Sequence, residues 1–372
     1  MKNNNVMGVV FANVHDDLIR ELTEVRSMAS VPFGGRYRMI DFPLSNLVNA
    51  GVSKVGVIPK YNYHSLMDHL GSGKPWDLDR KSGGLSILPP YLTSDVDVDA
   101  GHIDSLNTVM SYLRGSKEKY IVMCDADVVG NIDISKMLDA HFESKADITI
   151  AYKNGPLPKS KNDIMSFEMD KDGRINKIRI PENFGVTCDF SLDVVVMERV
   201  LLMDLVKTAR EENMSRRWRD VISSRIDQLK IYGYAVKEFA WVIDGTESYA
   251  NANFALLNPK VRAELFASDR PIYTKNRDDV PTRYGLNSKV TNSLIADGCV
   301  IEGEVNNCII FRGVRVEEGA SLSNCIIMQD SVIRRAADLK FVITDKNTEI
   351  TEGRALCGAP THYMSIRKSA KV

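Results

Sequence analysis

The sequence predicts an α/β domain with a doubly wound, mostly parallel sheet, followed by a parallel β-helix. From the N-terminus to about residue 250, short apolar strands alternate with helical patterns, which is typical of a sheet with helices on both faces. From about Asn287, apolar residues recur every six positions. That period is typical of a β-helix in which each short strand turns one apolar side chain inward.

In the first part, buried strands are expected at Val6–Phe11, Lys54–Pro59, Tyr120–Cys124, Ile148–Tyr152 and Val194–Met197. Helices are expected between them at Pro43–Ala50, Tyr63–Leu70, Ser105–Leu113 and Ile134–Glu143. Ligands of such sheets bind at the carboxyl ends of the strands. The polar segment 251–285 contains three prolines and is interpreted as a connector. The expected domains are therefore residues 1–250 and 286–372.

The six-residue period in the second part is carried by Ile295, Ile301, Ile310, Val316, Leu322, Ile327 and Ile333. A longer near-repeat begins at Asn292, Asn307 and Asn324, with spacings of 15 and 17 residues that approach three hexads. Three short strands per coil would produce both periods. An irregular all-β domain is the alternative.

Composition excludes several classes of protein. The net charge of −1 over 372 residues provides no broad cationic field for nucleic acid or an anionic membrane, so neither partner is expected. The apolar run Val6–Val14 is too short to span a membrane and lacks the flanks of a signal peptide. Six scattered cysteines without a CxxC pair indicate reduced thiols in a cytoplasmic protein and no structural zinc.

Three motifs resemble bacterial glucose-1-phosphate adenylyltransferase, also called ADP-glucose pyrophosphorylase. They are VPFGGRYRMIDFPLSNLVNAG (31–51), GSGKPWDLDRKSGGLSILPPY (71–91) and Asp345-Lys346-Asn347. The resemblance implies a nucleotidyltransferase-like (Rossmann-like) domain joined to a left-handed β-helix, and a tetramer that acts in glycogen synthesis. It also implies transfer of the adenylyl group of ATP to glucose 1-phosphate, with Mg²⁺ and release of pyrophosphate.

The loop that should hold the phosphates of ATP lacks its glycines. Active members have a glycine-rich loop after the first strand, because close approach of backbone N–H groups to phosphate leaves no room for a Cβ. Here Gly8 alone remains, while Phe11, Asn13 and Val14 fill the loop, and Asp16 adds negative charge. A plain strand-to-helix turn is expected instead.

The resemblance also shows which catalytic groups are missing. In the tetrad that matches the family's R-A-K-P stretch, Arg26 is retained, as a surface or interface residue, but Met28 replaces the lysine. A preorganised cation at such a position typically contributes about 10²–10³ in rate. Asp127 matches one metal-ligating aspartate, whereas Ile243 stands at the second, in WVIDGT. Asp244 is one step along and is expected on the opposite face of a strand.

The sugar-phosphate and nucleotide contacts are altered as well. The family's E-K-P corresponds to Arg179–Pro181, and its S-M-G corresponds loosely to Phe190–Leu192. The segment that lines the nucleotide keeps Gly101 and Asp104, and His102 between them is interpreted as a loop residue without a chemical role.

Asp127 and Asp104 are thus the expected remnants of a catalytic site, with Asp127 as a weak metal ligand. The chain is expected to be weakly active or inactive. No cofactor is then required, and Mg²⁺ would matter only for residual catalysis.

The chain further resembles the GlgD-type regulatory subunit of Firmicute bacteria, which implies a catalytic glucose-1-phosphate adenylyltransferase subunit as its partner in a mixed tetramer. The family's effector-binding cations correspond to Arg36, followed by Arg38, and to Lys346 in the β-helix, with Arg334 and Arg335 as a further pair. Arginine forks suit bidentate recognition of phosphate. The expected effector is a nucleotide or a sugar phosphate.

Two other functions stay open. One is an active adenylyltransferase with an altered ATP loop, which the retained Asp127 and Asp104 allow. The other is an acyltransferase, since β-helices of this kind often carry that chemistry. Such an enzyme needs a histidine base, and His362 alone follows the hexads, in a helix expected to have about four coils.

Overall fold

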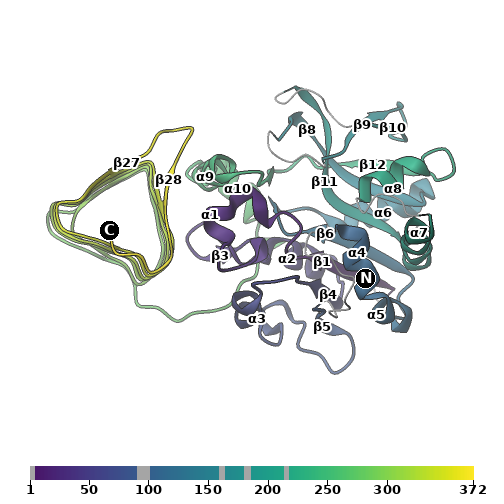
Figure 1. Ribbon diagram of the computed structural model, residues 1–372, viewed down its shortest axis with the longest axis horizontal. Helices are drawn as coiled ribbons and strands as arrows, with labels where there is room; N and C mark the ends of the chain where they lie inside the picture. Colours follow the sequence, from purple (N-terminus) through teal and green to yellow (C-terminus); the bar gives the residue numbers. More distant parts are fainter. Residues whose placement is uncertain (1–4, 90–100, 159–163, 180–185, 213–217) are drawn as a thin grey trace.

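The computed structural model describes residues 5–89, 101–158, 164–179, 186–212 and 218–372. Two units lie side by side: an α/β domain, and a three-sided β-helix that is seen end-on as a triangle in Figure 1. In the described part of the chain, no helix is long and apolar enough to cross a membrane.

The α/β domain is built on a nine-stranded sheet with β1 (Val6–Phe11) near its centre. β1 runs parallel to β4 (Lys54–Ile58) on one side and to β6 (Tyr120–Asp125) on the other. β11 (Thr187–Glu198) is antiparallel to both β6 and β8 (Ile148–Pro156). The sheet is therefore more mixed than expected. The other strands of this sheet are β5 (Gly84–Ile87), β9 (Ser166–Met169), β10 (Ile175–Arg179) and β12 (Ile231–Ala235).

Helices cover both faces of the sheet, as expected for a doubly wound fold. Val6 and Val10 of β1 belong to one buried cluster, and Met7, Val9 and Phe11 belong to another, so both faces of this strand are buried. The first cluster includes residues of α2 (Asp41–Asn49), α3 (His64–Leu70) and α6 (Ile134–Ser144). The second includes residues of α4 (His102–Thr108), α5 (Met110–Gly115), α7 (Arg199–Glu211) and α8 (Trp218–Ser224).

The element boundaries differ from the sequence prediction, most clearly at the following three places. The single helix expected over Ser105–Leu113 is divided at Val109 into α4 and α5. The strand expected at Val194–Met197 is the end of the longer β11. The segment interpreted as a connector contains the end of α9 (Thr246–Ala255) and all of α10 (Pro259–Leu265). Smaller elements are the α1 turn (Arg20–Thr23), the 3-10 turns Asp16–Ile19, Met28–Ser30 and Lys74–Trp76, the hairpin β2 (Pro32–Phe33) and β3 (Tyr37–Arg38), and the pair β7 (Val128–Gly130) and β13 (Ala240–Val242).

The C-terminal unit is a left-handed β-helix made of three parallel sheets of five strands each, one coil more than expected. One sheet contains β14 (Arg283–Tyr284), β17 (Val300–Ile301), β20 (Arg315–Val316), β23 (Val332–Ile333) and β26 (Glu349–Ile350). The second contains β15 (Lys289–Thr291), β18 (Glu304–Asn306), β21 (Ser321–Ser323), β24 (Asp338–Lys340) and β27 (Ala355–Cys357). The third contains β16 (Leu294–Ile295), β19 (Ile309–Ile310), β22 (Ile326–Ile327), β25 (Val342–Thr344) and β28 (Met364–Ile366).

Both sequence periods of this unit have a structural cause. The hexad residues from Ile301 to Ile333 are buried in its core, and Ile295 is packed against it. Asn292, Asn307 and Asn324 occupy the same turn in successive coils, each with a left-handed φ. Their side chains form a ladder in which each Nδ2 donates to the next Oδ1, at 2.8 and 2.5 Å.

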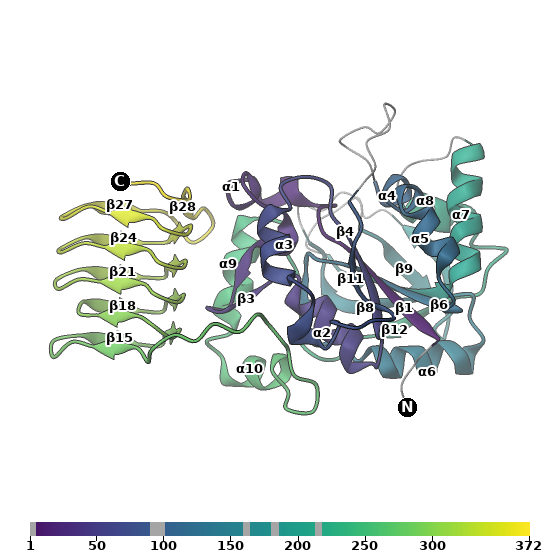
Figure 2. The same cartoon turned by 90° about the horizontal axis from the view of Figure 1, so that it is seen from below.

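A third buried cluster, here called the interdomain cluster, joins the two units. From the α/β domain it contains Met28, Phe33, Met39, Phe42, Val129, Ile243 and Tyr249, and from the β-helix it contains Ile309, Phe311, Ile326, Met328 and Ile343. In Figures 1 and 2, α1, β3 and α9 lie nearest the β-helix. Gly35, at the tip of the β2–β3 hairpin with φ +85°, lies against the β-helix, and a Cβ added there would be 3.6 Å from the Ile310 carbonyl oxygen.

Candidate functional site

Two aspartates and a histidine converge where β1 and β6 end. Asp125 is the last residue of β6 and lies opposite Phe11, the last residue of β1. Asp127 follows in the turn to β7, and His15 follows β1. His15 Nδ1 lies 2.9 Å from Asp127 Oδ2 and 3.6 Å from Asp125 Oδ2. All three side chains are buried, at the edge of the sheet where ligands of this fold class bind.

A second histidine holds Asp125 from the other side. His102, the first residue of α4, places Nε2 2.9 and 3.0 Å from the two oxygens of Asp125. Its ring also meets the ring of Phe11 edge-on, with centroids 4.7 Å apart. The sequence prediction of a loop residue without a partner was wrong, because the contact joins the start of α4 to the end of β6 through the tertiary fold. Asp104 lies in the same first turn of α4 and is half-buried.

The loop after β1 is tied to the protein interior. The buried carboxylate of Asp16 accepts hydrogen bonds from the Met28 backbone N–H at 2.6 Å and from Asn13 Nδ2 at 2.5 Å. Burial raises the pKa of Asp16 to about 6. Gly8 has a packing role, because a Cβ there would lie 2.8 Å from Leu47 of α2. The plain turn expected from the sequence is therefore held in place by its own side chains.

The two positions at which the family's catalytic groups are missing are both apolar core. Met28 and Ile243 have 1% and 0% of their surface exposed, and both belong to the interdomain cluster. The Ile243 N–H donates to the Asp127 carbonyl at 2.8 Å, so this position adjoins the aspartates while its side chain packs elsewhere. Mg²⁺ prefers several oxygen ligands. The pairing of Asp127 with the residue at 243 therefore does not fit Mg²⁺.

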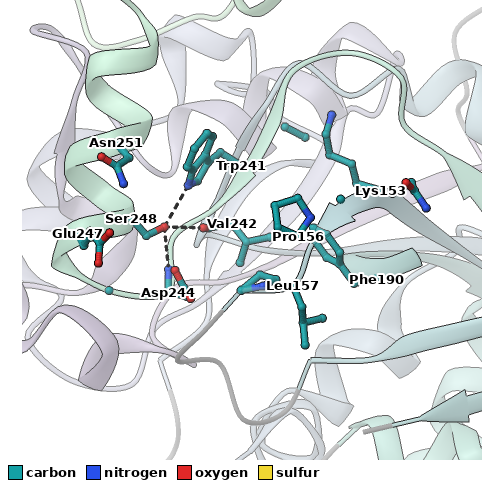
Figure 3. A pocket seen from close by; sticks show the side chains of 15 residues that line it. Lys153, Pro156, Leu157, Phe190, Trp241, Val242, Asp244, Glu247, Ser248 and Asn251 are labelled. Carbon is teal, nitrogen blue, oxygen red and sulfur yellow. Dashed lines mark hydrogen bonds between the residues drawn. The ribbon is translucent and has the colours of Figure 1, made fainter. Parts of the chain in front are cut away.

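A cavity of about 320 Å³ borders the segment around Ile243 and is lined by its neighbours Val242 and Asp244. Figure 3 shows Phe190, Pro156 and Trp241 on its wall, with Asp244 beside Ser248. Ser248 Oγ accepts from Trp241 Nε1 at 3.0 Å and donates to the Val242 carbonyl at 2.9 Å. The wall is mainly apolar and aromatic, which is usual for a small-molecule pocket.

The remaining sugar-phosphate positions are only partly described. Arg179, the last residue of β10, forms an ion pair with Glu168 of β9. Ile180 and Pro181 lie outside the described residues, as do Pro90 and Tyr91 at the end of the second motif.

Cationic side chains gather between the α/β domain and the β-helix. Arg26 is fully buried, and its Nη1 lies 2.9 Å from Asp345 Oδ1. Arg38 donates from Nη1 to the backbone and side-chain oxygens of Ser65, at 2.6 and 2.9 Å. Burial, and then repulsion from Arg38 and Arg26, lower the pKa of Lys346 to about 7. We call Arg26, Arg38 and Lys346 the cationic cluster; its excess of positive charge suits an anionic ligand.

The other predicted cations have contacts outside the cationic cluster. Arg334 forms ion pairs with Glu317 and Glu349, both at 2.9 Å, along one edge of the β-helix. Arg335 is exposed, and its backbone N–H donates to Glu317. Arg36 is exposed at the tip of the β2–β3 hairpin, near Arg312 of the β-helix. The place of Arg26 in this cluster could not be predicted from the sequence, because its approach to Lys346 depends on how the two units dock.

Comparison with known proteins matches both units. A family model described as nucleotidyl transferase matches residues 18–179, and a model described as GlmU-like, C-terminal hexapeptide matches residues 280–361. The chain is 36% identical over 369 residues to the glycogen biosynthesis protein GlgD of Bacillus subtilis, covering 99% of this chain and 97% of that protein. It is 37% identical over 319 residues to GlgD of Geobacillus stearothermophilus, covering 86% and 83%. It is also 33% identical over 319 residues to glucose-1-phosphate adenylyltransferase of Thermosipho melanesiensis, covering 85% and 77%.

Proposed function

Because the chain belongs to the family of GlgD glycogen biosynthesis proteins and glucose-1-phosphate adenylyltransferases, we propose that it is a regulatory subunit in glycogen synthesis with little or no adenylyl transfer of its own. It assembles with a catalytic glucose-1-phosphate adenylyltransferase and changes the activity of that subunit. One observation carries the proposal: Met28 and Ile243, at the two missing catalytic positions, are buried together in the interdomain cluster.

Adenylyl transfer needs a cationic side chain facing the reacting phosphates and a metal ion held by carboxylates. A thioether and a hydrocarbon supply neither. Their burial also matters, because side chains packed between the two units cannot turn toward a substrate without opening that interface. The tied loop at Asp16 supports the same conclusion, since its carboxylate is bonded inward to Met28 and Asn13.

The cationic cluster supports an effector role. Arg38 comes from the α/β domain and Lys346 from the β-helix, so an anion bound between them would contact both units, while the buried Arg26 adds positive charge behind them. Arginine and lysine together are common ligands of phosphate groups. We propose that a nucleotide or a sugar phosphate binds here and shifts the docking of the two units. An effector can shift the equilibrium between two dockings of the units only if it binds one of them more tightly than the other.

Activity assays test the subunit role directly. The purified chain alone should release no pyrophosphate above background from ATP and glucose 1-phosphate with Mg²⁺. Co-expression with a catalytic relative should give a mixed oligomer with kinetics different from those of the catalytic subunit alone. Turnover by the chain alone at rates typical of a kinase, about 1–100 per second, would favour the active adenylyltransferase instead. Two non-associating species in sedimentation would count against the subunit role.

Anion binding tests the effector site. Sulfate is a useful probe because it keeps its charge across the pH range in which Lys346 titrates. Sulfate should bind more tightly at pH 6 than at pH 8.5, since the pKa of Lys346 is about 7. Lys346→Met should flatten this dependence, whereas Lys340→Met, at an exposed lysine of the same β-helix, should leave it unchanged. Equal pH dependence in both variants would remove Lys346 from the site.

Arg36 lies apart from the cationic cluster and tests a separate effector contact, the one that the resemblance to the family implies. Arg36→Ala should weaken the effector response of the mixed oligomer without changing assembly, because the side chain is exposed. Arg335→Ala, at another exposed arginine, is its matched control. An unchanged response in Arg36→Ala would remove that residue from the site.

A further inference from the structure

We propose that His15, Asp125 and Asp127 bind a divalent transition-metal ion, in a site that shares only Asp127 with the Mg²⁺ site that the resemblance to the family implies. The family pairing uses Asp127 and the residue at 243, which is isoleucine here and packs into the interdomain cluster. The new site instead combines Asp127 with a histidine from the loop after β1 and with the last residue of β6.

The donor atoms are spaced as a metal ion requires. One ligand atom of each residue lies within 4.8 Å of the other two. His15 Nδ1 is 2.9 Å from Asp127 Oδ2 and 3.6 Å from Asp125 Oδ2. Metal–nitrogen and metal–oxygen distances of about 2.0–2.2 Å place neighbouring donors roughly 3.0 Å apart in an octahedron and roughly 3.4 Å apart in a tetrahedron. The observed separations lie near these values, so an ion could be held with small side-chain adjustments.

Electrostatics favour a cation at this place. The side chains of Asp125 and Asp127 are 3% and 1% exposed. Two carboxylates so close together and so buried repel each other, and buried charges in proteins are paired or coordinate metals. The neighbouring imidazoles of His15 and His102 offset the two negative charges only when each carries an added proton. A divalent ion would offset both and leave the imidazole of His15 neutral, as a metal ligand must be.

The surroundings provide the outer contacts of a metal site. His102 Nε2 lies within 3.0 Å of both oxygens of Asp125 and so fixes the orientation of this carboxylate. Such partners of ligating groups commonly hold them in place for the metal. His102 in turn is packed against Phe11 of β1. Asp125 therefore sits at the end of a buried strand, while Asp127 and His15 follow the ends of β6 and β1 in the adjoining turn and loop.

The donor set also determines the class of ion. An imidazole nitrogen with carboxylate oxygens suits Zn²⁺, Co²⁺ or Mn²⁺, whereas Mg²⁺ prefers oxygen ligands and retains its water. Affinity among the first-row ions should rise from Mn²⁺ to Co²⁺. Zn²⁺ is expected to bind more tightly than Mn²⁺, and both more tightly than Mg²⁺.

Titration calorimetry on the full-length chain, freed of metal by a chelator, tests the proposal with ZnCl₂, MnCl₂ and MgCl₂. Saturable binding of one Zn²⁺ per chain is expected, with Mg²⁺ at least about 100-fold weaker. His15→Gln and Asp125→Asn should each weaken Zn²⁺ binding by about 100-fold or more. His362→Gln, at an exposed histidine of the β-helix end, should leave it unchanged.

Circular dichroism and thermal unfolding establish that each variant is folded. If one variant fails to fold, the other still decides, because both remove a donor from the same ion. The absorption spectrum of bound Co²⁺ provides a second measurement, and it should change in His15→Gln but not in His362→Gln. Absence of saturable Zn²⁺ binding, or equal affinity in wild type and both donor variants, would overturn the proposal. This outcome is independent of whether the chain acts as a regulatory subunit.

Discussion

Replacing Met28 by lysine tests whether a former catalytic position now belongs to the protein core. The Met28 side chain is 1% exposed and packs in the interdomain cluster. In an active relative the lysine at this place would face phosphate. In this chain its ammonium group would enter an apolar environment, where the charged form is disfavoured. Met28→Lys is therefore expected to destabilise the chain and to leave adenylyl transfer unrestored.

The size of the effect follows from the cost of the charge. The methylenes of lysine keep much of the apolar packing of methionine, so the ammonium dominates. If burial lowers its pKa from about 10.4 to about 7, the cost at neutral pH is roughly 4 kcal/mol, at about 1.4 kcal/mol for each pH unit below 10.4. That is a large part of a typical stability of about 5–15 kcal/mol. Met28→Leu, a swap of similar volume, should cost less than about 1.5 kcal/mol.

The pH dependence distinguishes a buried charge from poor packing. A lysine with a lowered pKa in the folded state binds fewer protons there than in the unfolded chain, so stability rises with pH between the two pKa values. The gap in unfolding free energy between Met28→Lys and Met28→Leu should shrink by about 2.7 kcal/mol from pH 7.5 to pH 9.5.

Urea unfolding followed by tryptophan fluorescence, at one protein concentration, measures this gap. At pH 7.5 the buried charge alone predicts a gap of roughly 4 kcal/mol. The reasoning fails if the two variants agree within about 1 kcal/mol at that pH and the gap shows no trend with pH. It fails more completely if Met28→Lys also releases pyrophosphate, because the lysine would then face substrate rather than the core.

Three further changes probe the same region. Ile243→Asp should lower the free energy of unfolding by about 3–5 kcal/mol without producing transfer activity, because it places an unpaired carboxylate in the interdomain cluster. Thermal unfolding checks this, with Ile243→Val as the control variant. Equal melting temperatures of the two variants would contradict the prediction. The pKa of Asp16 is raised from 3.8 to about 6 in the folded state, so its contribution to stability falls by up to about 3 kcal/mol as the pH rises from 4 to 7. Asp16→Asn should remove that slope, and parallel pH profiles of variant and wild type would refute the assignment. Gly35→Ala should lower the free energy of unfolding by about 1–2 kcal/mol, because φ at this residue is +85°. Gly115→Ala, at a glycine with open space around it, should leave stability unchanged. Similar melting temperatures of the two variants would show that the hairpin tolerates a Cβ.

The fold could be predicted because its signals are local and repeated. Each hexad of the β-helix places an apolar residue such as Ile310 or Leu322 in the core, and the same pattern recurs in every coil. The uniformly apolar run Val6–Phe11 likewise predicts a strand covered on both faces, which β1 is. The direction of β11 could not be predicted, because antiparallel pairing depends on which strands meet and not on the residues within one strand.

The site was less predictable, because its contacts join distant parts of the chain. His15 and Asp125 are 110 positions apart in sequence, and only the parallel register of β1 and β6 brings them together. Arg26 and Asp345 meet only through the docking of the two units. Matching to family motifs identified Met28 and Ile243 as losses, but it could not show that both side chains fill the same apolar cluster.

That shared location links the two substituted positions to the proposed regulatory role. Met28 packs between the units in the interdomain cluster, and Arg26, two residues earlier, forms an ion pair with the β-helix. One short segment therefore supplies both apolar and ionic contacts to the same interface. An anion bound at Lys346 and Arg38 would act on this interface directly, because these cations lie on its two sides. A chain with such contacts in this segment is suited to the proposed effector response, through the docking of its two units.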